Sequence, residues 1–349
     1  MDIRKLLQDS IEKGASDLHI IANAPPIMRI NGELVPQEEY PALSSDETKK
    51  LIYSFLSDRQ RVMFEEKKEI DFSLSIPGIA RFRVNVHIQR GNVEAALRTV
   101  NLRIPPLEEL NLPEVVKTLI SKPSGMVIVT GATGMGKTTT LASIVDRINE
   151  ERRALIITIE DPVEYIHTNR KGVVKQREVG TDTLSFANAL KYALRQDPDV
   201  VSVGEMRDLE TISTALTAAE TGHLLLTTLH TPDAPQTIDR IIDVFPPHQQ
   251  RQIMVQLAGC LQGIIAQLLL PRANGEGRIL ATEVLIATPA IRALIREHRT
   301  DQIQSLIQTG SQYGMQTMDK SLKELYQQGL ITYETALTKS KNAEDFRRL

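Results

Sequence analysis

The sequence predicts an α/β protein in which a small α+β domain precedes a larger domain built on a mostly parallel sheet. Between residues 126 and 228, four short and nearly continuous apolar runs alternate with helical patterns, which is typical of strands covered on both faces. Before residue 100, short strands with turn residues between them dominate instead. A glycine-rich loop at 131–138 directly follows the first apolar run. Together these patterns predict two domains of different architecture.

The first domain is predicted from short elements and a turn signal. Helices are expected at 3–13, 45–56 and 58–66, and strands at 17–21, 27–30, 70–75, 80–89 and 93–100. Asn31 and Gly32 tolerate the positive φ of a type I′ turn and so predict a hairpin. Pro105 and Pro106 stiffen the chain and mark a linker at 105–115. We therefore expect an N-terminal domain at 1–104 and a second domain at 116–349.

The second domain is predicted from strands that alternate with helices. Buried strands are expected at 126–129, 154–159, 200–204 and 224–228, and helices at 139–149, 208–220, 235–244 and 249–269. The last third of the chain has helical patterns apart from a strand at 279–286.

The composition is that of a folded protein, since 41% of the 349 residues are hydrophobic and 24% are charged. A formal charge of −3 gives no overall attraction to nucleic acid, so no nucleic-acid partner is expected. The single cysteine, Cys260, excludes an internal disulfide. The chain begins with an amphipathic helical pattern and contains no run of about 18 to 20 apolar residues, which favours a cytoplasmic location.

The loop at 131–138 matches the G-x-x-x-x-G-K-[ST] pattern of phosphate-binding loops. Its glycines let backbone N–H groups converge on phosphates, Lys137 neutralises the β- and γ-phosphates, and the Thr138 hydroxyl can ligate Mg²⁺. The helix that follows directs its N-terminal dipole at the same anion. The expected nucleotide-binding residues are Gly131, Ala132, Thr133, Gly134, Met135, Gly136, Lys137, Thr138 and Thr139.

Acidic residues follow two of the predicted strands. Glu205 comes after the run at 200–204, at the sheet edge where nucleotides bind, and is predicted to orient the water that attacks the γ-phosphorus and to contact Mg²⁺ through water. Glu160 ends the run at 154–159, with Glu164 in a supporting role, which suggests a network of Mg²⁺ and water. A helix-cap or surface-charge role for this second cluster stays open.

Two histidines and three arginines are further candidates. His223 and His230 bracket an apolar run, and either one of them senses the γ-phosphate or both are structural. Arg81, Arg83 and Arg98 lie on the last strands of the first domain. They form either a solvated strand face or arginine fingers that neutralise charge at a phosphate site.

Four motifs resemble, in the same order, those of the secretion ATPase superfamily. They are the Walker A loop at 131–138, an Asp box at 158–165, a Walker B segment at 203–208 and a His box at 221–231. The resemblance implies a PAS-like N-terminal domain, a RecA-like P-loop NTPase domain, ATP hydrolysis and a ring-shaped homohexamer. It also implies that Arg83 and Arg98 reach nucleotide from the N-terminal domain, with Arg81 nearby.

Residues 290–297 resemble a C-terminal motif of the type IV pilus retraction ATPases. This resemblance implies a cytoplasmic motor for twitching motility, peripheral at the inner membrane, which acts through an inner-membrane pilus platform protein and has a second retraction ATPase as a further partner. The alternatives are an accessory retraction or pilus-extension ATPase and, less favoured, a RecA-like nucleic-acid translocase. Met135 replaces a small residue of the family pattern and is expected to supply only its backbone N–H, and Ala293 replaces a frequent Asn.

Overall fold

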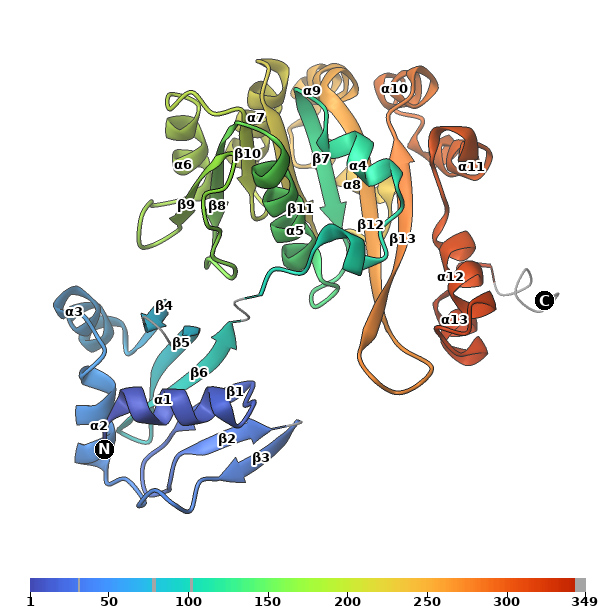
Figure 1. Ribbon diagram of the computed structural model, residues 1–349. Helices are drawn as coiled ribbons and strands as arrows, with labels where there is room; N and C mark the ends of the chain where they lie inside the picture. The colour runs from blue at the N-terminus through green and yellow to red at the C-terminus, as the bar shows by residue number, and fades with distance from the viewer. Residues whose placement is uncertain (31, 77–79, 101–102, 343–349) are drawn as a thin grey trace. The chain divides into compact units, whose positions relative to one another are not determined.

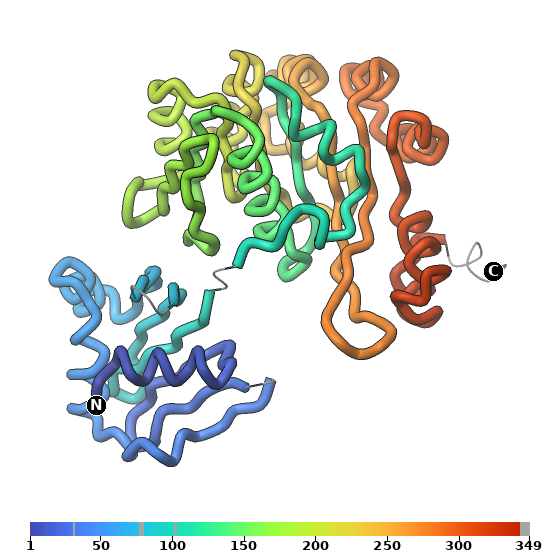
Figure 2. The backbone as a smooth tube through the Cα atoms, in the orientation of Figure 1, coloured from blue at the N-terminus to red at the C-terminus, as the bar shows by residue number. Residues whose placement is uncertain are grey.

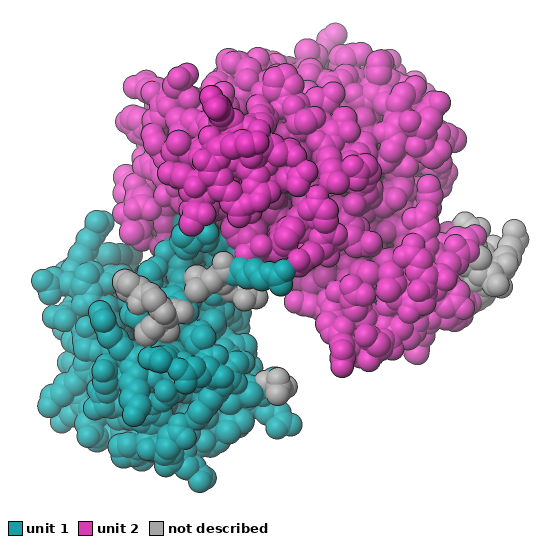
Figure 3. All heavy atoms as spheres, viewed as in Figure 1, with its two compact units in different colours: residues 1–103, 162–166 teal, residues 104–161, 167–349 magenta. Residues whose placement is uncertain are grey.

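The computed structural model describes residues 1–30, 32–76, 80–100 and 103–342. The chain divides into two compact units (Figure 3). Unit 1 contains residues 1–103 together with the short segment 162–166, and unit 2 contains residues 104–161 and 167–349. The segment 162–166 thus belongs to unit 1 although the residues on both sides of it belong to unit 2.

Unit 1 is an antiparallel sheet with helices packed on one face (Figure 1). The strand order is β3-β2-β1-β6-β5-β4. The strands are β1 (Asp17–Ile20), β2 (Ile27–Ile30), β3 (Glu33–Pro36), β4 (Glu69–Ile76), β5 (Ala80–Gln89) and β6 (Asn92–Val100), and the helices are α1 (Ile3–Glu12), α2 (Ser45–Tyr53) and α3 (Asp58–Lys67). Ile30 pairs with Glu33 in the β2–β3 hairpin and Gly32 has a φ of 90°, while the predicted Asn31 lies outside the described residues.

Unit 2 is built on a seven-stranded sheet of order β13-β12-β7-β11-β10-β8-β9. All neighbouring strands are parallel except β12 and β13, which run side by side as an antiparallel pair (Figure 2). The strands are β7 (Gly125–Thr130), β8 (Leu155–Glu160), β9 (Val173–Glu178), β10 (Val200–Val203), β11 (Leu224–Leu229), β12 (Leu261–Pro271) and β13 (Arg278–Ile286). This architecture confirms the predicted α/β class with a mostly parallel sheet.

Helices cover both faces of this sheet (Figure 1). One face packs against η1 (Leu107–Leu110), α4 (Val115–Ile120) and α5 (Lys137–Glu151). The other packs against α6 (Phe186–Ala193), α7 (Leu209–Glu220), α8 (Ala234–Asp243), α9 (Pro247–Cys260), α10 (Pro289–Arg296) and α11 (Ile303–Thr309). Helices α12 (Met318–Gln327) and α13 (Tyr333–Lys339) pack on β12 and β13. The short helices η2 (Thr300–Gln302) and η3 (Ser311–Tyr313) lie directly before and after α11 in the chain. Burial on both faces explains why β7 and β11 consist only of buried residues.

The predicted helix at 249–269 is wrong, because α9 ends at Cys260 and β12 begins at Leu261. An apolar run of this kind is compatible with a buried helix or a buried strand, so the local pattern did not separate the two. In the fold, β12 gains two strand partners, β7 and β13. The Arg292 side chain donates to the carbonyls of Ala258 and Gly259, and so binds two carbonyl groups of the last turn of α9.

The stretch at 105–115, expected as a linker, is packed onto unit 2. It contains η1, and Leu107 is buried in the same apolar cluster as residues of α4 and α5. The Ser143 hydroxyl of α5 also donates to the carbonyl of Pro105 at 2.7 Å. The two prolines therefore begin a segment that is held by side-chain burial and does not act as a free spacer.

Candidate nucleotide site

The phosphate loop connects β7 to α5, as its sequence predicts. Gly131 has a φ of 147°, and a Cβ atom there would lie 2.7 Å from the carbonyl oxygen of Gln267 on β12. Gly136, immediately before α5, has a φ of 81°, in the left-handed region that other residues rarely adopt. The loop conformation therefore requires glycine at both positions, once for close approach and once for backbone geometry.

Lys137 is the buried cation of the loop. Its ammonium group donates to the carbonyl oxygens of Gly131 at 2.7 Å and Ala132 at 2.9 Å. Burial lowers the pKa of Lys137, and the charge of Glu205 opposes this shift. The ammonium is thus held over the loop by backbone acceptors, in the position from which a phosphate-loop lysine neutralises phosphate oxygens.

Met135 contributes more than its backbone to the loop. Its sulfur accepts a hydrogen bond from the backbone N–H of Leu269 on β12 at 3.3 Å, which corrects the expectation that this side chain supplies no polar atom. The backbone N–H of Met135 donates to the Ala132 carbonyl, also at 3.3 Å. The side chain therefore ties the tip of the loop to β12.

Glu205 and His230 lie beside the loop at the carboxyl edge of the sheet. In the sheet, β7 is followed by β11 and then β10. Strand β11 ends directly before His230, and β10 ends two residues before Glu205. The His230 ring reaches both neighbours: Nε2 is 3.4 Å from a Glu205 carboxylate oxygen, and Nδ1 is 3.5 Å from the hydroxyl of Thr133. The other Glu205 oxygen is 2.8 Å from Arg207 Nε. One histidine thus connects the phosphate loop to the predicted water-orienting acid.

Threonines that the sequence did not single out hold the His230 segment in place. Thr231 donates its backbone N–H to the hydroxyl of Thr130, the last residue of β7, at 3.0 Å. The Thr231 hydroxyl is 2.6 Å from that of Thr237 on α8. These bonds fix the chain after β11 against the strand that leads into the phosphate loop.

His223 lies at the other end of β11. Leu224 pairs with Gly125 at the start of β7, whereas Leu229 pairs with Thr130 at its end, so His223 and His230 are roughly 20 Å apart along the strand. The His223 ring lies 3.0 Å from the Ala218 carbonyl. Of the two histidines, the structure brings only His230 to the phosphate loop of this chain.

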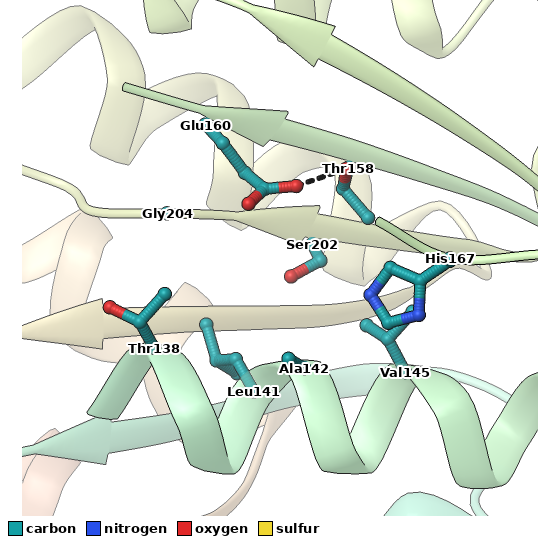
Figure 4. Close-up of a pocket in the computed structure, with 9 residues that line it drawn as sticks. All are labelled: Thr138, Leu141, Ala142, Val145, Thr158, Glu160, His167, Ser202 and Gly204. Carbon is teal, nitrogen blue, oxygen red and sulfur yellow. Dashed lines mark hydrogen bonds between the residues drawn. The ribbon is translucent and has the colours of Figure 1, made fainter. Parts of the chain in front are cut away.

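Glu160 ends β8, the neighbour of β10, and lines a cavity beside α5 (Figure 4). The cavity has a volume of about 40 Å³, which is sufficient for water. It is lined by Thr138, Leu141, Ala142, Val145, Thr158, Glu160, His167, Ser202 and Gly204. The predicted Mg²⁺ ligand Thr138 and the predicted acid Glu160 therefore share one water-sized space.

Glu164 belongs to the segment 162–166, which is part of unit 1. In the same segment, Val163 accepts a hydrogen bond from Arg81 Nε at 3.0 Å. The two glutamates of the acidic cluster, Glu160 and Glu164, are therefore assigned to different units. This division was not expected from the sequence, in which they are only four residues apart.

The three candidate arginines lie on one face of the unit 1 sheet. Arg83 and Arg98 are direct partners across β5 and β6, and Arg81 is two residues from Arg83 on the same strand. Arg98 forms an ion pair with Asp17 at 2.8 Å. Burial raises the pKa of Asp17, but its bonds to Arg98 and Ser16 and the Arg98 charge outweigh this, so the pKa is lowered. Two cations placed directly opposite each other repel, and the Asp17 carboxylate offsets this repulsion at Arg98.

Within residues 1–30, 32–76, 80–100 and 103–342, no cluster of three or more His, Cys, Asp or Glu side chains could hold a metal ion. No helix in the described part of the chain has the length and apolar character to span a bilayer.

Phosphate loops of this geometry, set at the carboxyl edge of a parallel sheet, occur in nucleotide-binding α/β proteins, and the fold and site place this chain in that class. The chain belongs, more narrowly, to the family described as type II/IV secretion system protein, whose family model matches residues 1–338.

Individual relatives extend over the whole chain. The type IV pilus retraction ATPase PilT of Pseudomonas aeruginosa is 49% identical over 346 residues, which cover 99% of this chain and 100% of the relative. The type IV pilus ATPase PilU of the same organism is 45% identical over 347 residues, and the alignment covers 99% of this chain and 91% of PilU. A crystal structure of the pilus retraction motor PilT with bound ADP has a TM-score of 0.94 at 50% identity and covers both chains completely.

Proposed function

We propose that this protein is an ATP-hydrolysing motor that powers type IV pilus retraction and twitching motility. The observation that carries the proposal is the connection from Thr133 of the phosphate loop through His230 to Glu205 at one sheet edge. The similarity to PilT over the full length of both chains supports the same function. The geometry of the site and the similarity over the full length therefore support the same proposal.

In this function the phosphate loop binds ATP and Mg²⁺. Lys137 neutralises the β- and γ-phosphates, and the Thr138 hydroxyl is a ligand of Mg²⁺. When bound, the metal neutralises charge that develops on the phosphate oxygens. Glu205 orients the attacking water and would contact Mg²⁺ through water, and Glu160 supports this water network from the cavity that it lines.

His230 senses the γ-phosphate, because its ring contacts a loop residue and Glu205 at once. Arg83 and Arg98, with Arg81, provide cations from unit 1 that stabilise the transferred phosphoryl group. Glu164 has a supporting role beside Glu160 in the network of Mg²⁺ and water.

The motor works as a cytoplasmic homohexamer at the inner membrane, where it acts on the platform protein of the pilus machine. A second retraction ATPase is a further partner. The second candidate function is that of an accessory retraction ATPase, and the 45% identity to the type IV pilus ATPase PilU fits another pilus ATPase of the same family. The direction of the force on pili, measured in cells that lack the protein, distinguishes these retraction roles from pilus extension.

Two experiments test the proposal. Lys137→Ala and Glu205→Ala should each abolish ATP turnover, because they remove phosphate binding and water orientation respectively; turnover at the wild-type rate in either variant contradicts the site. A strain that lacks the protein should carry many pili and fail to move on surfaces. Cells without pili would instead indicate an assembly enzyme.

A further inference from the structure

Two side chains hold the Glu160 carboxylate through the same oxygen. The hydroxyl of Thr158 donates to Glu160 Oε1 at 2.6 Å, and the side-chain amide of Gln176 donates to it at 3.1 Å (Figure 4 shows the first of these bonds). Hydrogen bonds to an ionised carboxylate are shorter and stronger than neutral ones. Two donors thus converge on one oxygen of the carboxylate and restrict its rotation.

The strand register explains why these three side chains meet. Thr158 and Gln176 are partners across the parallel pair β8 and β9, and Glu160 is two residues beyond Thr158 on the same strand. Side chains two apart on a strand point to the same face of the sheet. The contact is therefore a consequence of sheet pairing, and β9 is the strand that supplies the second donor.

The orientation of the Gln176 amide is fixed by its other end. Its Oε1 atom accepts the backbone N–H of His167 at 2.8 Å. A backbone N–H can only donate, so the oxygen of the amide must face His167 and the NH₂ group must face Glu160. The His167 side chain is only 3% exposed and lines the same cavity as Glu160.

This carboxylate adjoins the space in which water next to the metal would lie. The cavity of about 40 Å³ is large enough to hold water. Buried water needs several polar partners, and Glu160, Thr138 and Ser202 line this cavity. A small rotation of the carboxylate would change which water it can bind. Positioning of Glu160 therefore matters for the arrangement of water beside Thr138.

We propose that Thr158 and Gln176 are positioning residues for ATP hydrolysis, which hold the Glu160 carboxylate against the water cavity beside Thr138. The inference rests on the proposed function. Each of the two residues donates a hydrogen bond to Glu160, and Thr158 also lines the cavity itself. Loss of either donor should slow the chemical step more than it weakens nucleotide binding.

The test compares ATPase kinetics of the full-length protein and its variants at saturating Mg²⁺. Thr158→Val keeps the shape and strand preference of the side chain but removes the donor, and Gln176→Leu removes the second donor. Each should lower kcat about tenfold, the size typical of lost support for a site ligand, with KM for ATP within about twofold. Thr158→Ser restores a hydroxyl and should return kcat to within about twofold of wild type. Lys175→Leu, an exposed neighbour on β9, is the matched control and should be unchanged.

Three results would overturn the inference. Wild-type kcat in both Thr158→Val and Gln176→Leu, alongside inactive Lys137→Ala and Glu205→Ala, would exclude the positioning role while the proposed function stands. A Thr158→Ser variant as slow as Thr158→Val would show that the hydroxyl is not the cause. Absence of ATP hydrolysis by the wild-type protein would overturn the proposed function and this inference with it. If Gln176→Leu fails to fold, the Thr158 pair decides alone.

Discussion

Replacement of Arg292 by alanine should destabilise unit 2 at the junction between α9 and β12. The Arg292 side chain donates to the carbonyls of Ala287 at 2.9 Å, Gly259 at 2.7 Å and Ala258. A hydrogen bond to a charged group contributes about 1.5–3 kcal/mol when buried, and this side chain is only partly buried. We therefore expect the free energy of unfolding to fall by about 2–4 kcal/mol. For a unit of this size that lowers Tm by roughly 5–15 °C.

The assay is thermal unfolding at one fixed protein concentration, followed by circular dichroism. Arg296→Ala is the matched control, because Arg296 lies one turn further on α10 and is exposed, so its loss should change stability by less than about 0.5 kcal/mol. Equal Tm values for the two variants would refute the reasoning. Arg292 lies in the stretch that resembles the retraction motif, so a motor role of that motif is better tested with Arg296 alone.

Three further outcomes are expected. Gly131→Ala should weaken binding of a fluorescent ADP analogue at least tenfold, because the added Cβ would lie 2.7 Å from the Gln267 carbonyl; unchanged affinity would contradict this. Burial lowers the pKa of His167, so the folded state binds fewer protons than the unfolded state. The contribution of His167 to the free energy of unfolding is therefore fully present above the unfolded pKa of about 6.5, and it is lost as the pH falls toward the folded pKa. Urea unfolding at several pH values should show a smaller acid loss for His167→Gln than for wild type. Lys341→Met should lower the free energy of unfolding by about 1 kcal/mol in the same assay, since it removes the cation that lies 2.7 Å from Asp233 and 3.8 Å from fully buried Glu283. An unchanged free energy of unfolding would show that other groups balance the charge of these two carboxylates.

Much of the candidate site was predictable because its signals are local. The Gly131 to Thr138 pattern determines a loop whose glycines have few alternatives, and the apolar runs before Glu160 and Glu205 indicate strand ends at one edge of a parallel sheet. The structure places both acids at that edge. Their chemical roles remain predictions that the variants above test.

The rest of the site depends on strands whose pairing the sequence does not reveal. The strand β9 was not predicted, because its exposed and partly buried residues lack the apolar run of its neighbours, so Gln176 had no visible link to Glu160. Thr158 could have been found, since it lies two residues before Glu160 on a predicted strand and must share its face.

The separation of His223 from His230 was in principle predictable, because the two histidines bracket a single strand. A strand of six residues carries its ends to opposite edges of the sheet. Only the parallel register with β7 shows which edge carries the phosphate loop.

Short-range patterns of glycine, charge and apolar spacing were sufficient to predict the α/β class, the phosphate loop and the family. Tertiary structure alone decided that α9 stops at Cys260, that Met135 binds the Leu269 N–H, and that Glu160 is held by Gln176. Each of these depends on an acceptor or donor from a distant part of the chain. The physical reason is that hydrogen bonds and strand pairs are satisfied in three dimensions, so residues with little local preference take their conformation from the partners that the fold brings to them.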